Sequence, residues 1–235
     1  MDLSCRVILS DIEGTTSSVS YVYDVLFPYF REHILEITQF AHLAEVKEAF
    51  SEVIGICERE EGVILTTSEG VMQKLLEWSI KDKKFTPLKT LQGIIWNKGY
   101  QLGELKGHVY DDVSVNLEKW STNGLKIGIY SSGSITSQKL LFKYSLAGDL
   151  TKWLSCYFDT TIGHKRNEDS YLKIAAGIGQ DPSEIVFLSD IQEELSAARQ
   201  AGFKTIHILR EEGSSSTSTY RAKDFNEVNN LLHQL

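Results

Sequence analysis

Short apolar runs alternate with helical patterns along much of this chain. Runs that are brief, rich in β-branched residues and closed by polar residues are typical of buried parallel strands. Such runs occupy residues 6–10, 126–130, 185–188 and 205–208, with a weaker one at 158–161. Between them, apolar residues at helical spacing predict helices at about 135–144, 170–177, 193–201 and 224–232. This alternation predicts an α/β protein with a doubly wound parallel sheet and helices on both faces.

The segment from residue 19 to residue 105 has a different texture. Its apolar residues recur only at helical spacing, and no alternating strand pattern interrupts them. Thr86 and Pro87 mark the end of one helix and the start of the next, because proline is tolerated in a first turn. We therefore predict an α/β catalytic core formed by residues 1–18 and 106–235, with a helical cap at 19–105 inserted after the first strand. A cap in this position can close over the strand ends and exclude water.

The charge balance narrows the possible partners. The 235 residues include 32 acidic and 24 basic side chains, which gives a formal net charge of −8. Such a chain repels phosphate backbones and anionic lipids, so we expect neither nucleic acid nor a membrane as a partner. A small anionic substrate stays compatible, because a local lysine and backbone N–H groups can hold it. No feature specifies a partner surface, and a monomer is the expectation.

The cysteines and the N-terminal segment favour a cytoplasmic protein. Cys5, Cys57 and Cys156 are scattered, with no CxxC pair and no histidine at metal-ligand spacing, which favours reduced thiols. Residues 1–6 begin acidic and lack an apolar core, so no signal peptide is predicted. No apolar run reaches membrane-spanning length. Entry into the nucleus is also compatible with these features if the source is eukaryotic.

The pentapeptide at residues 11–15 carries the strongest chemical signal. It directly follows the first predicted strand, and ligands of open α/β sheets bind at the carboxyl ends of strands. Asp11 can act as a nucleophile and Glu13 is placed for proton transfer. Gly14 and Thr15 can turn backbone N–H groups toward an anion. The structural alternative is a polar strand end that caps the next helix.

Further polar clusters stand at predicted strand ends or helix starts: Ser131 with Ser132, Lys165, and Asp190 with Glu193 and Glu194. At one edge of a parallel sheet, these clusters would converge with Asp11. Together they supply what phosphoryl transfer through an aspartyl-phosphate needs. These requirements are a nucleophile, an acid–base carboxyl, cationic and hydroxyl contacts for phosphate, and oxygen ligands for Mg²⁺.

Each of these clusters also has a structural interpretation. Residues 131–134 can cap a helix, a role that is compatible with anion binding. Lys165 taken alone would usually be a solvated surface lysine, and Asp190 could cap the helix that follows it. His108 and His164 are left out of the catalytic set, because a lone histidine is more often a structural hydrogen-bonding residue.

The chain also carries an ordered set of short motifs: Leu26–Phe30, Ile95-Trp96, Gly99-Tyr100, Gly103, Gly107–Val113, Tyr130–Ser134, Gly163, Lys165, Ser170-Tyr171 and Phe187–Asp190. With Asp11–Thr15 they cover nearly the whole chain. This set resembles the haloacid dehalogenase superfamily of phosphatases and, within it, the enolase-phosphatase family of methionine salvage, also called acireductone synthases. The superfamily usually opens with Asp-x-Asp. The form with Glu13 in the second place, followed by Gly-Thr, is similar to that of the enolase-phosphatases.

The resemblance implies a haloacid dehalogenase-like Rossmannoid core with an inserted cap, and it implies one Mg²⁺ per subunit. Asp11 and Asp190 would bind the metal through their side chains, and Glu13 through its backbone carbonyl. Asp11 would also be the nucleophile. Glu194 would bind the metal through water or orient Lys165, and Glu193 fits that position less well.

The resemblance also implies how the phosphate is bound and what reaction follows. Ser131, Ser132 and Lys165 would bind the substrate phosphate. The family's substrate, 2,3-diketo-5-methylthiopentyl-1-phosphate, is first enolised and then dephosphorylated to the acireductone 1,2-dihydroxy-3-keto-5-methylthiopentene. Glu13 and a cap residue are both candidates for removing the carbon-bound proton. Two alternatives stay open: a phosphatase of another small phosphate ester, and a catalytically silent binding module on the same fold.

Overall fold

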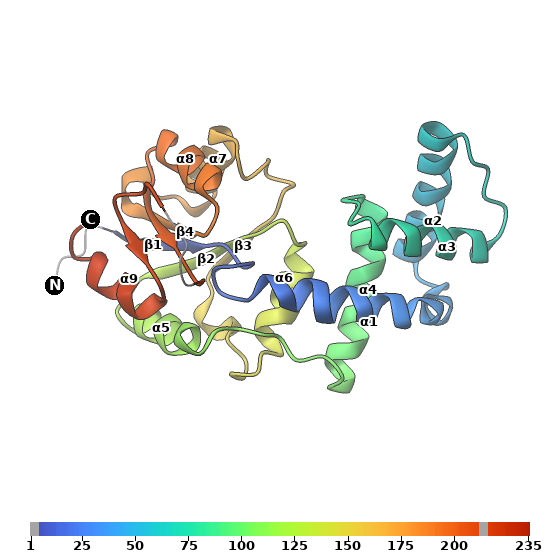
Figure 1. Ribbon diagram of the computed structural model, residues 1–235, viewed down its shortest axis with the longest axis horizontal. Coiled ribbons are helices and arrows are strands. Elements are labelled where there is room, and N and C mark those ends of the chain that lie inside the picture. The colour runs from blue at the N-terminus through green and yellow to red at the C-terminus, as the bar shows by residue number, and fades with distance from the viewer. Residues whose placement is uncertain (1–4, 212–215) are drawn as a thin grey trace. The chain divides into compact units, whose positions relative to one another are not determined.

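Parallel strands form a six-stranded sheet in the part of the chain that the computed structural model describes, residues 5–211 and 216–235 (Figure 1). The strands are β1 (Val7–Ser10), β2 (Lys126–Tyr130), β3 (Cys156–Phe158), β4 (Ile185–Ser189), β5 (Lys204–Ile208) and β6 (Arg221–Ala222). Their order is β3-β2-β1-β4-β5-β6, so the chain winds outward from β1 in both directions. The prediction of a doubly wound α/β fold is confirmed.

The helices around the sheet are α5 (Asp111–Thr122), α6 (Ile135–Lys143), α7 (Glu168–Ile178), α8 (Gln192–Gln200) and α9 (Phe225–Leu231), with 3₁₀ turns η4 (Thr151–Trp153) and η5 (Pro182–Glu184). Strands β1 and β4 are buried throughout, as their unbroken apolar pattern predicts. Leu9 belongs to a buried cluster with Tyr171 of α7 and Leu195 of α8. Figure 1 shows these two helices on one side of the sheet. On the opposite face α5 packs against α9, and the rings of Trp120 and Phe225 lie 5.0 Å apart.

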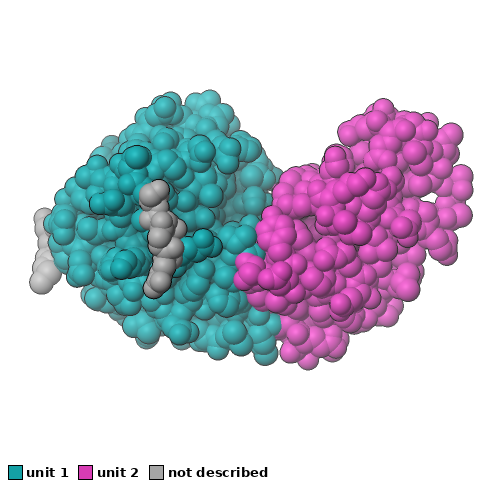
Figure 2. Space-filling view, viewed as in Figure 1, with its two compact units in different colours: residues 1–19, 106–235 teal, residues 20–105 magenta. Residues whose placement is uncertain are grey.

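The chain divides into two compact units (Figure 2). Residues 1–19 and 106–235 contain the sheet, and we call them the core unit. Ser20–Leu105 form the second unit, which we call the helical insert; all of its residues are described and none lies in a strand. The elements of the insert are η1 (π-helical, Tyr21–Leu26), α1 (Phe27–Glu32), η2 (3₁₀, Ile34–Phe40), α2 (Ala44–Ile56), η3 (π-helical, Cys57–Glu61), α3 (Ser68–Ile80) and α4 (Thr86–Leu102).

Helical spacing of apolar residues builds a separate core in the insert, where Trp78 is among the largest fully buried side chains. Pro87 lies in the first turn of α4, as the sequence predicts. The end of the preceding helix differs from the prediction, because α3 stops at Ile80. Asp82 then adopts a left-handed conformation with a φ of 49°, which a helix does not accommodate.

Other departures from the predicted elements have local causes. Helix α5 is missing from the prediction because polar residues dominate its sequence and obscure its apolar face. Strand β3 ends at Phe158, where the prediction of 158–161 begins. The carboxylate of Asp159 accepts a hydrogen bond from the N–H of Thr161 at 2.9 Å and turns the chain. Strand β6 has only two residues, too few for a pattern. Residues 1–4, part of the segment in which no signal peptide is predicted, lie outside the described residues.

Candidate active site

A tight turn follows β1 and carries Asp11 at its start. The carbonyl of Ile12 accepts hydrogen bonds from the N–H groups of residues 15–17 at 2.9–3.1 Å. Gly14 has a φ of 73°, and a Cβ atom there would clash with the carboxylate of Asp190, so the position requires glycine. Because β1 and β4 are neighbours, this close approach holds two acidic residues at one edge of the sheet.

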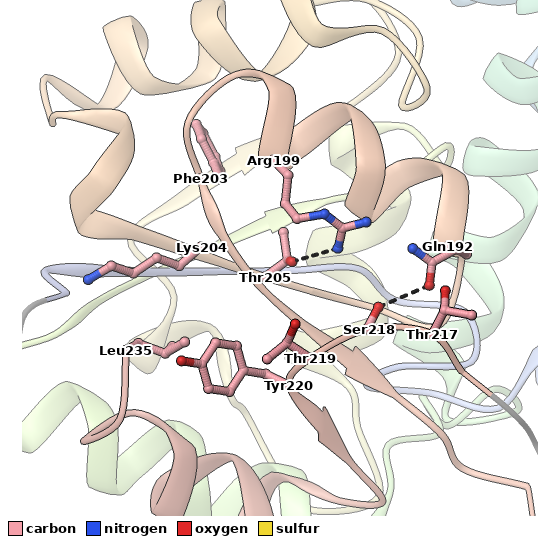
Figure 3. Close-up of a pocket in the computed structure, with 10 residues that line it drawn as sticks. All are labelled: Gln192, Arg199, Phe203, Lys204, Thr205, Thr217, Ser218, Thr219, Tyr220 and Leu235. Carbon is pink, nitrogen blue, oxygen red and sulfur yellow. Dashed lines mark hydrogen bonds between the residues drawn. The ribbon is translucent and has the colours of Figure 1, made fainter.

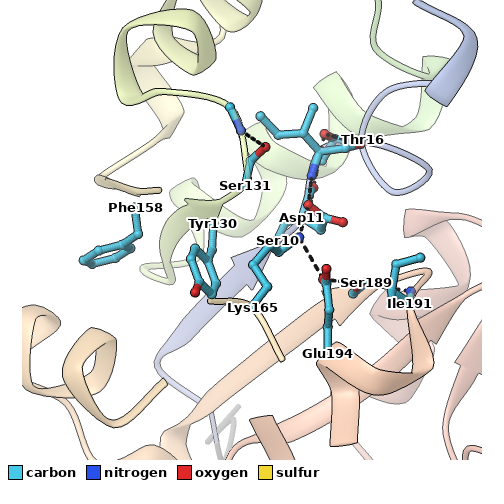
Figure 4. A network of polar contacts seen from close by, with 12 residues as sticks. Ser10, Asp11, Thr16, Tyr130, Ser131, Phe158, Lys165, Ser189, Ile191 and Glu194 are labelled. Carbon is cyan, nitrogen blue, oxygen red and sulfur yellow. Dashed lines mark hydrogen bonds and ion pairs between the residues drawn. The ribbon is translucent and has the colours of Figure 1, made fainter. Parts of the chain in front are cut away.

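Lys165 joins two buried carboxylates in an ion-pair network (Figure 4). Its Nζ lies 2.5 Å from Asp11 Oδ1 and 2.7 Å from Glu194 Oε2, and the three side chains are only 8%, 6% and 11% exposed. Burial acts to lower the pKa of Lys165, but the charges of Asp11 and Glu194 outweigh it and raise that pKa. Burial, with the charge of Asp11, raises the pKa of Glu194 to about 7. Lys165 is therefore a fixed cation between acidic groups.

Two tyrosines hold the loop that presents Lys165. The hydroxyl of Tyr130 donates to the carbonyl of Gly163 at 2.9 Å, and that of Tyr171 donates to the carbonyl of Lys165 at 2.6 Å. Gly163 has a φ of 147°, and a Cβ atom there would clash with the hydroxyl of Ser170. No role of these tyrosines is predicted from the sequence. Their signal is that a buried tyrosine needs a partner for its hydroxyl.

The serine loop follows β2 and leads into α6. Ser131 is buried and its hydroxyl accepts a hydrogen bond from the N–H of Gly133 at 3.1 Å, while Ser132 is half-buried. Ser134 accepts from the N–H of Ser137 at 3.3 Å and caps α6, so the capping interpretation is confirmed for this residue. Anion binding by Ser131 and Ser132 stays a prediction.

Gln138 fixes the serine loop from within α6. Its side-chain N–H groups donate to the carbonyls of Gly133 and Phe158, each at 2.8 Å. The carboxylate of Asp159 accepts from the N–H of Ile135 at 3.2 Å. Both residues connect the end of β2 to the end of β3, and neither role is predicted from the sequence. A glutamine on a buried helix face is the signal that could have identified Gln138.

Asp190 leaves the end of β4 without capping α8. The hydroxyl of Ser189 accepts from the N–H of Ile191 at 3.1 Å, and Ile191 stands at the N-cap position, so the capping interpretation of Asp190 is wrong. His207 on β5 contacts the carbonyl of Asp190 through Nε2 at 2.8 Å and so fixes this loop. Burial and the charge of Asp11 raise the pKa of the Asp190 carboxyl to about 6.

The other residues named from the sequence lie around these loops. Glu13 is half-buried in the turn after β1, and its backbone pairs with that of Ser17. Glu193 is exposed in the first turn of α8. His164 accepts a hydrogen bond from the N–H of Arg166 at 3.2 Å, which is a local structural contact. The structure thus joins Asp11, Lys165 and Glu194 directly and places Asp190 against the same turn.

Residues 5–211 and 216–235 contain no group of three or more His, Cys, Asp and Glu side chains arranged to hold a metal ion. The predicted magnesium ligands include only two side-chain carboxylates, those of Asp11 and Asp190, beside the backbone carbonyl of Glu13. In the same described residues, no helix has the length and apolar character needed to cross a membrane.

A cavity of about 380 Å³ lies beside α8, β5 and β6 (Figure 3). Arg199 donates there to the hydroxyl of Thr205 at 3.0 Å, and Ser218 donates to the side chain of Gln192 at 2.9 Å. Two pairs of polar side chains in the lining thus bind each other, and the lining contains none of the predicted site residues. The lining residues are Gln192, Arg199, Phe203, Lys204, Thr205, Thr217, Ser218, Thr219, Tyr220 and Leu235.

Comparisons with known proteins agree with this fold. A family model described as haloacid dehalogenase-like hydrolase matches residues 5–202. The crystal structure of the UTR4 protein from Saccharomyces cerevisiae is similar, with a TM-score of 0.77 and 31% sequence identity. The match covers 95% of this chain and 99% of that chain. The fold and these matches define the class, that of the haloacid dehalogenase-like hydrolases.

Relatives within this class are closer. The chain is 46% identical to the Enolase-phosphatase E1 of Marinobacter nauticus, in a match that covers 97% of this chain and 99% of the relative. It is 50% identical to the Enolase-phosphatase E1 of Pseudomonas fluorescens, over 90% of this chain and 92% of the relative. The chain therefore belongs to the enolase-phosphatase E1 family of haloacid dehalogenase-like hydrolases, and the resemblance inferred from its motifs is confirmed.

Proposed function

We propose that the protein is a bifunctional, Mg²⁺-dependent enolase-phosphatase, an acireductone synthase of methionine salvage. It converts 2,3-diketo-5-methylthiopentyl-1-phosphate and water into 1,2-dihydroxy-3-keto-5-methylthiopentene and phosphate. The observation that carries the proposal is the buried network of Asp11, Lys165 and Glu194 at the carboxyl end of the central strand β1. Relatives named Enolase-phosphatase E1 over almost the full chain support the choice of substrate.

The proposal assigns the two units different tasks. Residues 1–18 and 106–235 form the catalytic core, and residues 19–105 form a cap that excludes water from the reaction. The division of the chain into compact units of almost the same bounds supports this assignment. The concentration of buried charged groups in the core unit supports it too.

The donor set at the end of β1 and β4 suits a magnesium ion. Asp190 Oδ1 is buried and has no hydrogen-bond partner among the described residues. Burial and the nearby charge of Asp11 raise the pKa of this carboxyl, because both destabilise its anion. A hard divalent cation bound beside the carboxylate would stabilise that anion. In the proposal, the side chains of Asp11 and Asp190 and the backbone carbonyl of Glu13 hold one Mg²⁺. The ion supplies positive charge that lets a carboxylate and a phosphate anion approach each other.

Phosphoryl transfer then follows from the roles of the side chains. Asp11 attacks phosphorus and forms an aspartyl-phosphate, while the bond from phosphorus to the enol oxygen breaks and Glu13 protonates that oxygen. Glu13 next takes a proton from water, which attacks the aspartyl-phosphate and releases phosphate. Ser131 and Ser132 donate hydrogen bonds to the phosphate, and Lys165 offsets its charge. Enolisation precedes this transfer, with Glu13 and a cap residue as candidates for the carbon-bound proton.

The proposal also places the protein as a monomer in the cytoplasm. All three cysteines are free thiols, and Cys5 and Cys57 are buried, which suits a reducing compartment. Sedimentation velocity tests the monomer directly, and a stable dimer at micromolar concentration would contradict it.

The test of the function follows enol absorbance and released phosphate in one tube with the diketo phosphate and Mg²⁺. We expect both signals, enol first, and we expect a chelator to suppress phosphate release. Asp11→Asn should lose phosphate release while remaining folded. Hydrolysis of ordinary phosphate esters without turnover of the diketo substrate would leave only the phosphatase class. No turnover of either would favour the silent binding module.

A further inference from the structure

Arg210 reaches from the end of β5 to the turn that carries Asp11. Its Nε and Nη2 both donate to the carbonyl of Thr15, at 3.0 and 2.7 Å. Its Nη1 lies 2.7 Å from Asp112 Oδ1. The side chains of Arg210 and Asp112 are only 9% and 12% exposed. One buried guanidinium therefore donates two hydrogen bonds to a single backbone oxygen, that of the residue after Gly14.

The surroundings of Arg210 keep its long side chain in one place. The guanidinium lies 4.1 Å from the ring centroid of Tyr110 and 5.3 Å from that of Phe225. The other carboxylate oxygen of Asp112 accepts from the N–H of Phe225 at 2.7 Å. Stacking on the two rings and the ion pair with Asp112 thus hold the guanidinium in the orientation in which it donates to the carbonyl of Thr15.

The same segment of chain holds the remainder of the turn. The N–H of Tyr110 donates to the carbonyl of Thr16 at 3.0 Å. Nδ1 of His108 lies 3.1 Å from the N–H of Ser18 and 3.2 Å from the hydroxyl of Ser17. Burial lowers the pKa of His108, which keeps Nδ1 available as an acceptor. The motif at residues 107–113, for which no chemical role is predicted from the sequence, contributes several of these contacts.

The turn is small enough for a displacement at one end to reach the other. Three of its closing hydrogen bonds meet at the carbonyl of Ile12, directly after Asp11, and the N–H of Gly14 donates to the carbonyl of Ser17 at 2.8 Å. Gly14, one residue before Thr15, packs against the Asp190 carboxylate. A shift of the Thr15 carbonyl therefore moves the backbone beside both acidic groups.

We propose that Arg210 is a positioning residue: by holding the carbonyl of Thr15, it fixes the turn that sets Asp11 and Glu13 against the substrate phosphate. This inference rests on the proposed function for its reaction. Arg210 acts through the backbone and touches no substrate. The proposed phosphate contacts, Ser131, Ser132 and Lys165, lie on other loops, so loss of Arg210 affects the chemical step and not phosphate binding.

The first variant is Arg210→Ala, assayed for kcat and KM with the diketo phosphate. We expect kcat to fall about 100-fold, because a displacement of about 1 Å in a reacting group has this effect, with KM nearly unchanged. Added guanidinium, kept below denaturing concentration, should recover much of the lost kcat by occupying the vacated position. Arg6→Ala is the matched control, since Arg6 belongs to the same unit and its side chain is 63% exposed.

A double variant separates positioning from stability. Arg210→Ala leaves Asp112 as an unpaired buried charge, which destabilises the fold. Arg210→Gln combined with Asp112→Asn removes both charges. We expect this protein to regain stability while kcat stays low. Hydrogen exchange of the backbone amides at residues 11–18 should be faster than in the native protein.

Wild-type kcat in the folded double variant, or unchanged exchange at residues 11–18, would overturn the positioning role. A kcat loss in Arg210→Ala that only tracks the fraction of unfolded protein would overturn it as well. The two proposals fail in different ways. If the native protein does not turn over the diketo phosphate, the proposed function fails, while hydrogen exchange still tests whether Arg210 holds the turn.

Discussion

Two lysines of this protein each contact two carboxylates, one in the core unit and one in the helical insert. Lys165 bridges carboxylates that are 6% and 11% exposed. Lys74 lies 2.6 Å from Glu61 Oε2 and 2.8 Å from Glu77 Oε2, but these carboxylates are 35% and 41% exposed. The hydrogen-bonding pattern is the same, and the difference is access to water.

Solvent access reverses the direction of the carboxyl pKa. Hydrogen bonds from Lys74 and then Lys81 lower the pKa of Glu77 to about 2, because water and the lysines both favour its anion. Burial and a second buried carboxylate raise the pKa of Glu194 to about 7. An exposed ion pair such as that of Lys74 and Glu77 contributes little to the stability of the fold beyond linking two turns of α3. A buried cluster with excess negative charge is held in a state that a bound cation can relieve.

The largest effect should come from breaking each cluster at its lysine. Lys165→Met removes the cation that faces the phosphate, and we expect kcat for phosphate release to fall about 10³-fold. Lys74→Met should leave kcat within about twofold, because its carboxylates stay solvated. Steady-state kinetics on both variants, with circular dichroism as a check of folding, measures the contrast. Similar losses of kcat in Lys165→Met and Lys74→Met would contradict the functional difference between the buried and the exposed cluster.

A smaller effect is expected at the second carboxylate of each cluster. Glu194→Gln keeps the shape of the side chain but weakens one anchor of Lys165, and we expect kcat to fall roughly 10-fold. Glu77→Gln is the matched change in the insert and should leave kcat as it is. An unchanged kcat in Glu194→Gln would show that Asp11 alone suffices to place Lys165.

The smallest effect concerns pH in the magnesium-free protein. Glu194, whose pKa is raised to about 7, lowers the stability of the fold when ionised, and this cost disappears as pH falls from about 7 toward its usual 4.5. Glu77, whose pKa is lowered to about 2, stabilises the fold above about 4.5, and this contribution is lost as pH falls toward 2. NMR titration of the two carboxyl carbons measures both midpoints. Midpoints in the opposite order would contradict the comparison.

The sequence predicts the sheet because strand signals are local. The apolar runs that precede Asp11, Ser131 and Asp190 can each be recognised without knowledge of the neighbouring strand. Parallel pairing then brings the ends of these strands to one edge of the sheet. Helix α5 has a weaker pattern, and the two residues of β6 have none. The elements that depend on a single run of residues were therefore the predictable ones.

The supports of the site could not be predicted in the same way. Arg210, which follows β5, binds the carbonyl of Thr15, which follows β1. His207 on β5 contacts the carbonyl of Asp190 at the end of the neighbouring strand β4. A backbone carbonyl leaves no trace in a sequence, so its partner is invisible until the fold places them together. Gln138 also acts on backbone carbonyls. The proposed roles of the catalytic side chains can be predicted because residue type indicates their chemistry. The roles of the residues that hold them in place depend on where the fold brings them, which the sequence does not indicate.

The central claim is that Asp11 is the nucleophile in this buried cluster. Rapid acid quenching during turnover of the diketo phosphate, followed by mass spectrometry of the peptide that contains residue 11, tests it most directly. We predict a phosphoryl group on Asp11 at early times, which disappears as phosphate is released. Full phosphate release with Asp11 unmodified at every quench time, and with Asp11→Asn still active, would contradict the account.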